Sequence, residues 1–317
     1  MIDPSPRPRS FVRTCITAFH AHRLVTAGSG MVLMLLLAAL AAPLLTRLEF
    51  LHSPSEQHLQ GLDIDGLPLG PGGPFRLGTD NLGRDVLARV VHATRISLPI
   101  AFGAMLTATG LGTLVGLLAG FHGGRLDAVL MRFTEINLTI PAILLAVAFA
   151  GLMDGRILHL HPASLDWHFL DFRMQRGFLS LFLIIGLVCW PGMVRVIRAQ
   201  VLQLKEREFV TASRALGATD ARLIFHHILP NLMPTIIVLA VMSTGNMILL
   251  EAGLGYLGIG VPPPTPTWGT MISDGQPYFV SSPHIVVAPG VAIVATVLAF
   301  NLLGQGLQEA LSPRHRA

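Results

Sequence analysis

The sequence is poor in charged residues and in cysteine. Asp, Glu, Lys and Arg make up only 13% of its 317 residues, whereas a soluble domain typically carries about 25%. Its two cysteines, Cys15 and Cys189, lie far apart and imply no disulfide framework. The chain has no G-x-x-x-x-G-K-[ST] loop for phosphates, no H-E-x-x-H and no cysteine pair for zinc. We therefore expect neither an enzyme nor a metal site, and no cofactor bound to this chain.

Apolar residues are abundant instead: they form 52% of the chain, and the mean hydropathy is +0.62. Six stretches of 18 to 34 residues contain no Asp, Glu, Lys or Arg. A membrane-spanning helix needs roughly 20 apolar residues, and in lipid a helix satisfies its own backbone. The sequence thus predicts an all-α integral membrane protein with six transmembrane helices. We expect them at about 25–47, 97–120, 132–152, 177–197, 232–250 and 285–306.

The basic residues indicate an orientation. If the N-terminus is cytoplasmic, the inner segments hold 14 Lys and Arg and the outer segments hold 8. Cytoplasmic segments carry the excess of basic residues, so we expect both termini to be cytoplasmic. The pI of 9.8 then reflects topology rather than nucleic-acid binding, since no basic patch interleaved with aromatics supports the latter. Residues 1–24 form a cytoplasmic arm, and 25–47 is long enough to be a retained anchor rather than a signal peptide.

Residues 48–96 form a polar external segment. Proline and glycine cluster at 66–74, which indicates turns. Beyond this cluster, Asp80 or Asn81 can cap an amphipathic helix whose apolar face begins at Val86 and which we expect to lie along the membrane surface.

Two features are expected inside the apolar runs. Gly112, Gly116 and Gly120 follow one another at four-residue spacing, which lets helices pack closely in lipid. Pro141 and Pro191 fall within predicted helices and should kink them. Such a kink either widens a transport cavity or is a tolerated irregularity.

Residues 206–231 are polar and charged, yet they lie between two long apolar runs. Their pattern predicts two short helices joined at Gly217, the second capped by Asp220. The Ile-Leu-Pro-Asn string at 228–231 closes the segment. Such a segment suits a partner outside the bilayer, although an ordinary charged cytoplasmic loop is the alternative.

The last outer loop, 251–275, contains Gly253, Gly255 and Gly258 in a G-x-G-x-x-G pattern. No strand–helix unit surrounds it, so a dinucleotide site is disfavoured. Re-entrant backbone is the better interpretation. The string Pro-Pro-Pro-Thr-Pro-Thr-Trp-Gly at 262–269 should be stiff and extended.

Polar residues embedded in the apolar runs are few. Asn246, Glu251 and Asn301 are the candidates for a substrate pathway, because intramembrane polar groups are often functional. Glu135 can instead pair with Arg132, three residues earlier. The histidine pairs at 226–227 and at 159 and 161 are interpreted as surface residues, not as metal ligands.

Three strings resemble a known family. Residues 206–231 resemble the EAA loop of bacterial ABC importer permeases, which docks on the ATPase subunit. The Leu-Gly-Thr-Asp and Gly-Arg-Asp strings at 77–85 resemble dipeptide, oligopeptide and nickel permeases, as does the proline-rich string at 262–269. In the EAA pattern Ala212, Gly217, Leu229 and Pro230 fit, and Thr211 and Ser213 replace the first Glu and the second Ala.

The resemblance, which covers about 75–310, implies a type I ABC importer permease with a core at 97–310. It implies partners: a second homologous permease, two cytoplasmic ATPases that bind ATP and Mg, and an extracytoplasmic substrate-binding protein. The location would be the bacterial cytoplasmic membrane and the cargo di- or oligopeptides. The ATPase-coupling residues would be Glu208, Ala212, Gly217, Asp220, Leu229 and Pro230.

Two alternatives stay open. The same architecture could import nickel or another small solute, because the solute is selected by a binding protein absent from this chain. A secondary transporter is the more distant alternative. It would need buried charges for ion coupling, and the uncharged helices and the charged docking segment argue against it.

Overall fold

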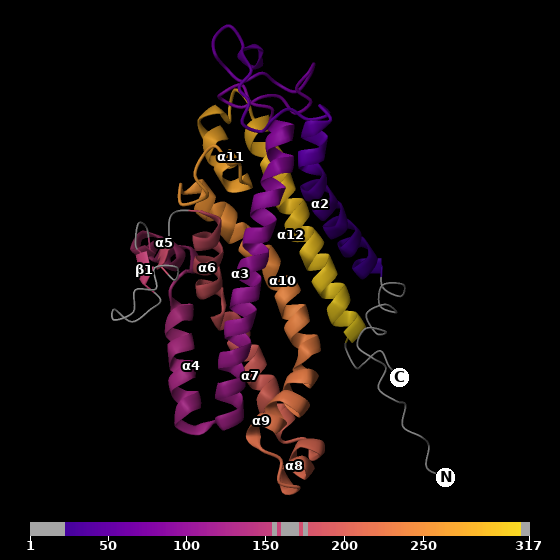
Figure 1. Cartoon of the computed structure of the whole chain (residues 1–317), viewed down its shortest axis with the longest axis vertical. Helices are drawn as coiled ribbons and strands as arrows, with labels where there is room; N and C mark the ends of the chain where they lie inside the picture. The colour runs from indigo at the N-terminus through magenta and orange to yellow at the C-terminus, as the bar shows by residue number, and fades with distance from the viewer. Residues whose placement is uncertain (1–22, 154–156, 160–170, 174–176, 312–317) are drawn as a thin grey trace.

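The computed structural model describes residues 23–153, 157–159, 171–173 and 177–311. These residues are almost entirely helical (Figure 1). The helices are α2 (Arg23–Arg47), η1 (Leu59–Gly61), α3 (Val86–His122), α4 (Gly124–Thr139), α5 (Ala142–Met153), α6 (Phe178–Cys189), α7 (Pro191–Lys205), α8 (Glu208–Ala215), α9 (Asp220–Arg222), the π-helix η3 (Leu223–Ile228), α10 (Leu229–Tyr256), α11 (Trp268–Gly275), η4 (Gln276–Tyr278) and α12 (His284–Leu311). Strands β1 (Ile157–His159) and β2 (Asp171–Arg173) form one short antiparallel pair.

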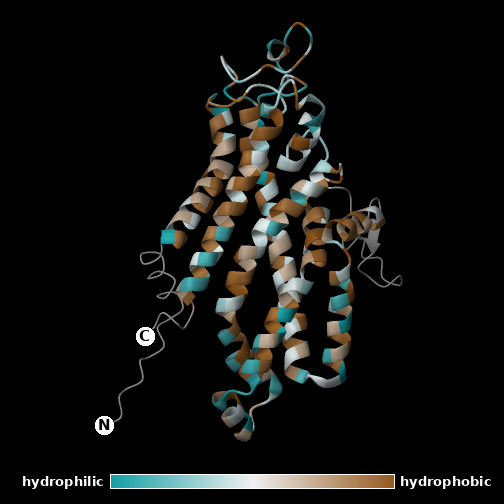
Figure 2. Ribbon diagram, turned by 180° about the vertical axis from the view of Figure 1, so that it is seen from behind, coloured by the Kyte–Doolittle hydropathy of each residue, from teal (hydrophilic) through white to brown (hydrophobic). Residues whose placement is uncertain are grey.

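Within the described residues, four helical runs are long and apolar enough to cross a membrane: α2, α3, the run Asp220–Tyr256 and α12. Two bent pairs, α4 with α5 and α6 with α7, raise the number to as many as six. Each predicted apolar range coincides with one of these runs or pairs. Hydrophobic residues dominate the long helices, whereas hydrophilic residues gather toward the end that carries α8 and α9 (Figure 2).

Both prolines interrupt helices, as predicted. Ile140, which precedes Pro141, is extended (φ −90°, ψ 128°), because a residue before proline avoids the α conformation. The axes of α4 and α5 differ by 96° across this break, so the helix predicted at 132–152 with a kink at Pro141 is divided into two helices. At Pro191, the first residue of α7, the bend is 46°.

Helix α3 differs from the prediction at its start. Its cap is Asp85, whose carboxylate accepts hydrogen bonds from the backbone N–H groups of Leu87 (2.9 Å) and Ala88 (3.4 Å). The predicted caps Asp80 and Asn81 are therefore wrong. The helix continues unbroken for 37 residues, about 55 Å at the usual rise, so residues 86–96 are its first turns and not a separate amphipathic helix.

Helix α3 is also the centre of the packing. It contacts α6, α7 and α10, while α12 packs against α2 and α10 (Figure 1). Many leucines of α2 point outward and are exposed, for example Leu40 at 75% and Leu44 at 56%. An apolar outer surface suits contact with lipid tails.

The predicted glycine stripe lies where α3 crosses α7. A Cβ added at Gly112, Gly116 or Gly120 would come within 2.7–2.8 Å of the Cβ atoms of Met193, Ile197 and Val201. These approaches are closer than real Cβ contacts, so only glycine permits this helix separation. The packing role predicted from the four-residue spacing is confirmed.

We predict that Gly116→Ala destabilises the protein, whereas Gly110→Ala in the same helix does not. A Cβ at position 116 would be 2.8 Å from the Cβ of Ile197, and overpacking of this kind costs about 1–3 kcal/mol. A Cβ at position 110 meets nothing within 4 Å and removes the helix penalty of glycine. Thermal unfolding of the purified variants in detergent measures the difference. Equal midpoints for the two variants would contradict the proposed close packing of α3 on α7.

Candidate functional site

The segment from α8 to α9 forms one extreme end of the molecule (Figure 1). Helix α8 ends near Gly217, which adopts φ +85°, and the chain re-enters a helix at α9. The joint at Gly217 agrees with the sequence prediction. The cap does not: Thr219 caps α9 through a hydrogen bond from the N–H of Arg222 (3.4 Å), and Asp220 is the first residue of the helix.

Backbone hydrogen bonds close the turn after α8. The N–H of Gly217 donates to the carbonyl of Arg214 (3.0 Å), and the N–H of Ala218 donates to the carbonyl of Ser213 (3.1 Å). This pattern ends many helices, and it needs a residue with positive φ, usually glycine. A Cβ at Gly217 would meet nothing within 4 Å, so the requirement for glycine comes from the backbone angle and not from close approach.

One face of the segment is anchored in an apolar cluster. Val210 in α8 and Leu223 and Ile228 in η3 are fully buried. They pack with residues from α3, α7 and α10, namely Leu117, Phe121, Ile197, Val201, Leu232 and Ile236. Arg214 lies over the ring of Phe121, with its Cζ 5.9 Å from the ring centroid. The segment therefore packs directly against the helices behind it.

Two polar contacts hold the helices behind the segment. The guanidinium of Arg198 in α7 donates from Nε to Oδ1 (2.5 Å) and from Nη2 to Oδ2 (2.6 Å) of Asp127 in α4. Bidentate pairs of this kind fix geometry well. Lys205, at the end of α7, donates from Nζ to the carbonyl of Gly120 in α3 (3.1 Å). The base of the segment is thus joined to α3, α4 and α7.

The opposite face is free and partly apolar. Leu216 is 89% exposed, Phe225 62% and Phe209 42%. Of the residues predicted for coupling, Leu229 is half-buried and the others are exposed: Glu208, Ala212, Gly217, Asp220 and Pro230. Exposed large apolar side chains beside charged ones are typical of a protein-docking surface. The structure therefore brings the exposed coupling candidates together on one end of the molecule.

A cavity of about 430 Å³ lies farther along the helices. Its lining includes Asn246 in α10, Asn301 in α12, Ser243 and Cys189. Its remaining lining is apolar: Leu138, Ala142, Val188, Pro191, Gly192, Met193, Leu239, Met242 and Met247. Among the described residues, no charged side chain lines it. Two of the three predicted pathway residues therefore meet in one uncharged cavity.

Glu251, the third predicted pathway residue, is elsewhere. It lies within α10, not in a loop, and is fully buried. The hydroxyls of Ser97 and Thr267 are close to its carboxyl group, yet neither carboxyl oxygen has a well-aligned hydrogen bond. The structure thus does not bring Glu251 to the cavity that Asn246 and Asn301 share.

The string at 77–85 forms a buried structure at the opposite end of the molecule. Asp80 accepts hydrogen bonds from the N–H groups of Leu82 (2.9 Å) and Arg84 (3.0 Å), and its Oδ2 accepts one from Nε of Arg84 (2.7 Å). Asp85 caps α3 and also bonds to Nδ1 of His52 (2.8 Å). These residues are 6% exposed or less, apart from the more open Leu82 and His52.

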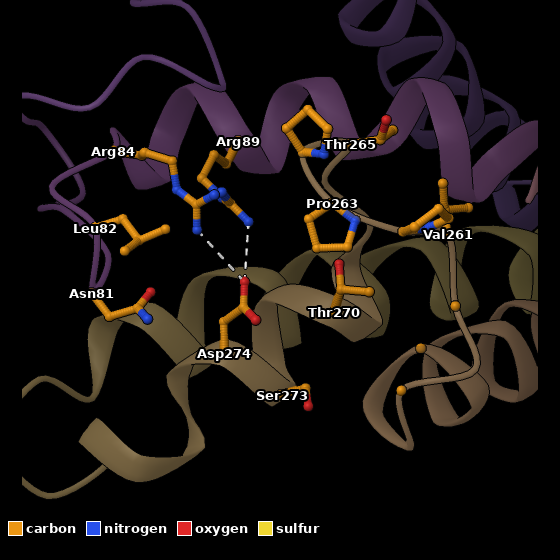
Figure 3. A pocket seen from close by; sticks show the side chains of 15 residues that line it. Asn81, Leu82, Arg84, Arg89, Val261, Pro263, Thr265, Thr270, Ser273 and Asp274 are labelled. Atoms are coloured by element: carbon orange, nitrogen blue, oxygen red, sulfur yellow. Dashed lines mark hydrogen bonds and ion pairs between the residues drawn. The ribbon is translucent and has the colours of Figure 1, made fainter. Parts of the chain in front are cut away.

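A second cavity, of about 340 Å³, adjoins this string (Figure 3). Arg84 and Arg89 border it on one side and Asp274 of α11 on the other. Sequence reasoning treated residues 77–85 as a family signature and missed this pocket. The one sequence feature that could have indicated it is Arg89, a charged residue in the first turns of an apolar helix. The described residues include no group of three or more His, Cys, Asp or Glu placed to hold a metal ion.

Comparison with known proteins gives consistent results. The family model described as "Binding-protein-dependent transport system inner membrane component" matches residues 112–317. The dipeptide transport system permease protein DppC of Alkalihalophilus pseudofirmus is 35% identical over 296 residues, which cover 93% of this chain and 88% of that protein. The di/tripeptide transport system permease protein DppC of Pseudomonas aeruginosa is 36% identical over 313 residues, covering 98% and 95%.

A solved structure has the same fold. The MetNI methionine ABC transporter, in an inward-facing conformation, aligns with a TM-score of 0.54 over 71% of this chain and 98% of that chain. The sequence identity is 17%, so this match speaks for the fold alone.

We predict that Gly217→Val loosens the turn between α8 and α9. A β-branched residue at φ +85° costs about 1–2 kcal/mol, so the turn should open about 5- to 30-fold more often. Hydrogen exchange of the amides in 208–222, measured by mass spectrometry, should become faster. Gly217→Asn should stay near the parent rate because asparagine tolerates positive φ.

Gly30→Ala is the matched control, because a Cβ at that helical glycine meets nothing within 4 Å. It should leave exchange in 208–222 unchanged. Unaltered exchange in Gly217→Val would show that the backbone angle at this joint does not limit the turn.

Proposed function

The chain belongs to the family of binding-protein-dependent transport system inner membrane components, and from this premise we propose that it is one permease subunit of an ABC importer for di- or oligopeptides. The observation that supports this cargo is the similarity to two peptide transport permeases over 93% and 98% of the chain, at 35% and 36% identity. The geometry contributes two further supports: an uncharged central cavity and a docking end away from it.

We place the protein in the bacterial cytoplasmic membrane, with six spans and both termini in the cytoplasm. The two bent helix pairs each serve as one span in this arrangement. The end that carries α8 and α9 is then cytoplasmic, and the pocket at Arg84 and Arg89 is external. The excess of basic residues on the proposed inner side supports the orientation.

The exposed face of α8 and α9 is the proposed docking surface for an ATPase subunit. Two ATPases, which would hold ATP and Mg, a second homologous permease and an extracytoplasmic binding protein complete the proposed importer. In this proposal Glu208, Ala212, Gly217 and Asp220 contact the ATPase directly. Leu229 and Pro230 begin α10 and are placed to pass the motion on.

The continuity of the helices suggests how docking would drive transport. The run from Asp220 through η3 to Tyr256 has no loop in it, so a displacement of α9 would move α10. Helix α7 is tied to α3 and α4 by Lys205 and Arg198. Both α7 and α10 line the central cavity. ATP-driven movement of the docking end would therefore reshape the cavity, as alternating access requires.

The cavity chemistry fits a peptide better than an ion. The amides of Asn246 and Asn301 can each donate and accept hydrogen bonds, as a peptide backbone does. Because the described lining carries no charge, neither acidic nor basic side chains of a peptide would be bound strongly enough to be retained in the cavity. A bare nickel ion would need carboxylate, imidazole or thiolate ligands, and in the described lining Cys189 alone could supply one. The nickel alternative stays open, because the binding protein selects the solute. The uncharged lining of the cavity disfavours a proton-coupled secondary transporter.

We predict that the chain transports nothing alone. Reconstituted into proteoliposomes by itself, it should neither hydrolyse ATP nor take up peptides under a proton gradient. With its ATPases, the second permease and the binding protein, uptake of a radiolabelled dipeptide should require ATP and persist when the proton gradient is collapsed. Uptake by the lone chain driven by a proton gradient would replace the ABC proposal with a secondary transporter.

A further inference from the structure

The external pocket is built by three parts of the chain that are distant in sequence. Residues 81–89, the Gly- and Pro-rich stretch 258–265 and helix α11 surround about 340 Å³ (Figure 3). This volume lies within the range of small-ligand sites, which combine an apolar wall with a few convergent polar groups. Prolines 262 to 264 supply the apolar wall.

Arg89 is the most deeply buried charged group of this pocket, with its side chain 4% exposed. Its Nη2 donates to Oδ2 of Asp274 (3.3 Å). Its Nη1 lies 3.2 Å from Oδ2 of Asp80 but is not aligned for a hydrogen bond, and its Nε has no partner. Leaving such buried donors unpaired is costly, so the arginine has hydrogen-bonding capacity for a further acceptor.

The two aspartates that contact these arginines are held differently. Asp80 is 3% exposed and receives Nε of Arg84 at 2.7 Å. Asp274 is 41% exposed, and its Oδ2 is 3.3 Å from Nη2 of Arg89 and 3.7 Å from Nη2 of Arg84 (Figure 3). Burial raises the pKa of Asp274, against the opposing effect of the two arginines. Asp274 is therefore the weaker and more easily displaced partner of the arginines.

We propose that this pocket binds a free carboxylate, the C-terminal group of a peptide substrate, which takes the place of Asp274 between Arg84 and Arg89. The inference rests on the proposed function and names a subsite for it. Guanidinium groups bind carboxylates in a planar, charge-assisted geometry. Asn81 lines the same pocket, and its side-chain amide can donate and accept hydrogen bonds.

Other groups of the pocket suit the rest of such a ligand. Thr270 and Ser273 also line the space, and Pro263 can pack against an apolar side chain (Figure 3). The volume exceeds what a single acidic side chain of a docked protein would fill. A terminal residue or two of a peptide fits better, so we favour the substrate over an acidic residue of the binding protein as the source of the carboxylate.

The test uses a photoreactive dipeptide with benzoylphenylalanine at its C-terminus, as the free acid and as the C-terminal amide. The assembled importer in lipid nanodiscs is irradiated with each probe, and adducts within 258–275 are quantified by mass spectrometry. The free acid should label this stretch several-fold more than the amide, because only the acid offers a carboxylate to the arginines.

Asp274→Asn should increase labelling by the acid several-fold, since it removes the competing internal carboxylate while preserving the side-chain shape. A merely structural role for Asp274 predicts a decrease instead. Asp65→Asn is the matched control: Asp65 is an exposed acidic residue of the external segment, outside the pocket lining, and its removal should change nothing.

Uptake of the same free-acid dipeptide is measured in parallel. Equal labelling by acid and amide, or reduced labelling in Asp274→Asn, would overturn the subsite; with uptake intact, the proposed peptide importer would stand. Absence of both uptake and labelling in the parent importer would reject the importer proposal together with the subsite. If Asp274→Asn instead alters capture of the binding protein without altering labelling, the carboxylate belongs to that partner and the subsite for peptide is wrong.

Discussion

The cost of placing charge in lipid governs how this molecule is organised. Its long helices hold few charged side chains, and the ionic contacts concentrate where those helices end. At one end Asp127 and Arg198 join α4 to α7. At the other end Asp80 pairs with Arg84 and Arg89, which also contact Asp274. Both charged centres therefore lie toward the ends of the helices, and the apolar middle is left to packing and to the uncharged cavity.

Close packing in that middle connects the two ends. The glycine stripe lets α7 lie directly on α3, and Gly217 lets the chain turn back into α9 and then α10 without leaving the docking end. Because α9, η3 and α10 form one candidate span, no flexible loop separates the docking surface from Asn246. A force applied at α8 and α9 can therefore reach the cavity through helices alone. This mechanical continuity is what the proposed ATP-driven cycle requires.

The sequence predicted best those features that depend on lipid and on local backbone geometry. Apolar runs located the helices, spacing located the glycine stripe, and Pro141, Pro191 and Gly217 marked real breaks. The residues that cap the helices were harder to predict, because several nearby residues can serve as caps. Asp85 and not Asp80 caps α3, and Thr219 and not Asp220 caps α9. At α3 the cap also depends on the preceding turn, in which Gly83 adopts positive φ, and not on residue type alone.

Contacts between distant residues were beyond the sequence. Asp274 meets Arg89 across 185 positions, so no spacing rule could join them into a pocket. Asn246 and Asn301 were selected only as polar residues in apolar helices, and their shared cavity depends on how α10 packs against α12. Glu251 satisfied the same rule and yet is buried beside Ser97 and Thr267, away from that cavity. A polar residue within a predicted span is therefore a candidate functional residue, but the sequence does not predict which cavity its side chain lines.

We propose that the end formed by α8 and α9 binds a cytoplasmic ATPase. Leu216→Cys, in a chain with Cys15 and Cys189 replaced by serine, places one thiol on the most exposed leucine of that end. In the assembled importer, a short bifunctional maleimide reagent paired with a cysteine in the ATPase groove should cross-link the two proteins, and nucleotide should change the yield. Cysteine at Leu59, exposed in the external segment, should give no such product. Labelling of position 216 by an impermeant reagent added outside intact cells, without cross-linking to the ATPase, would contradict the account.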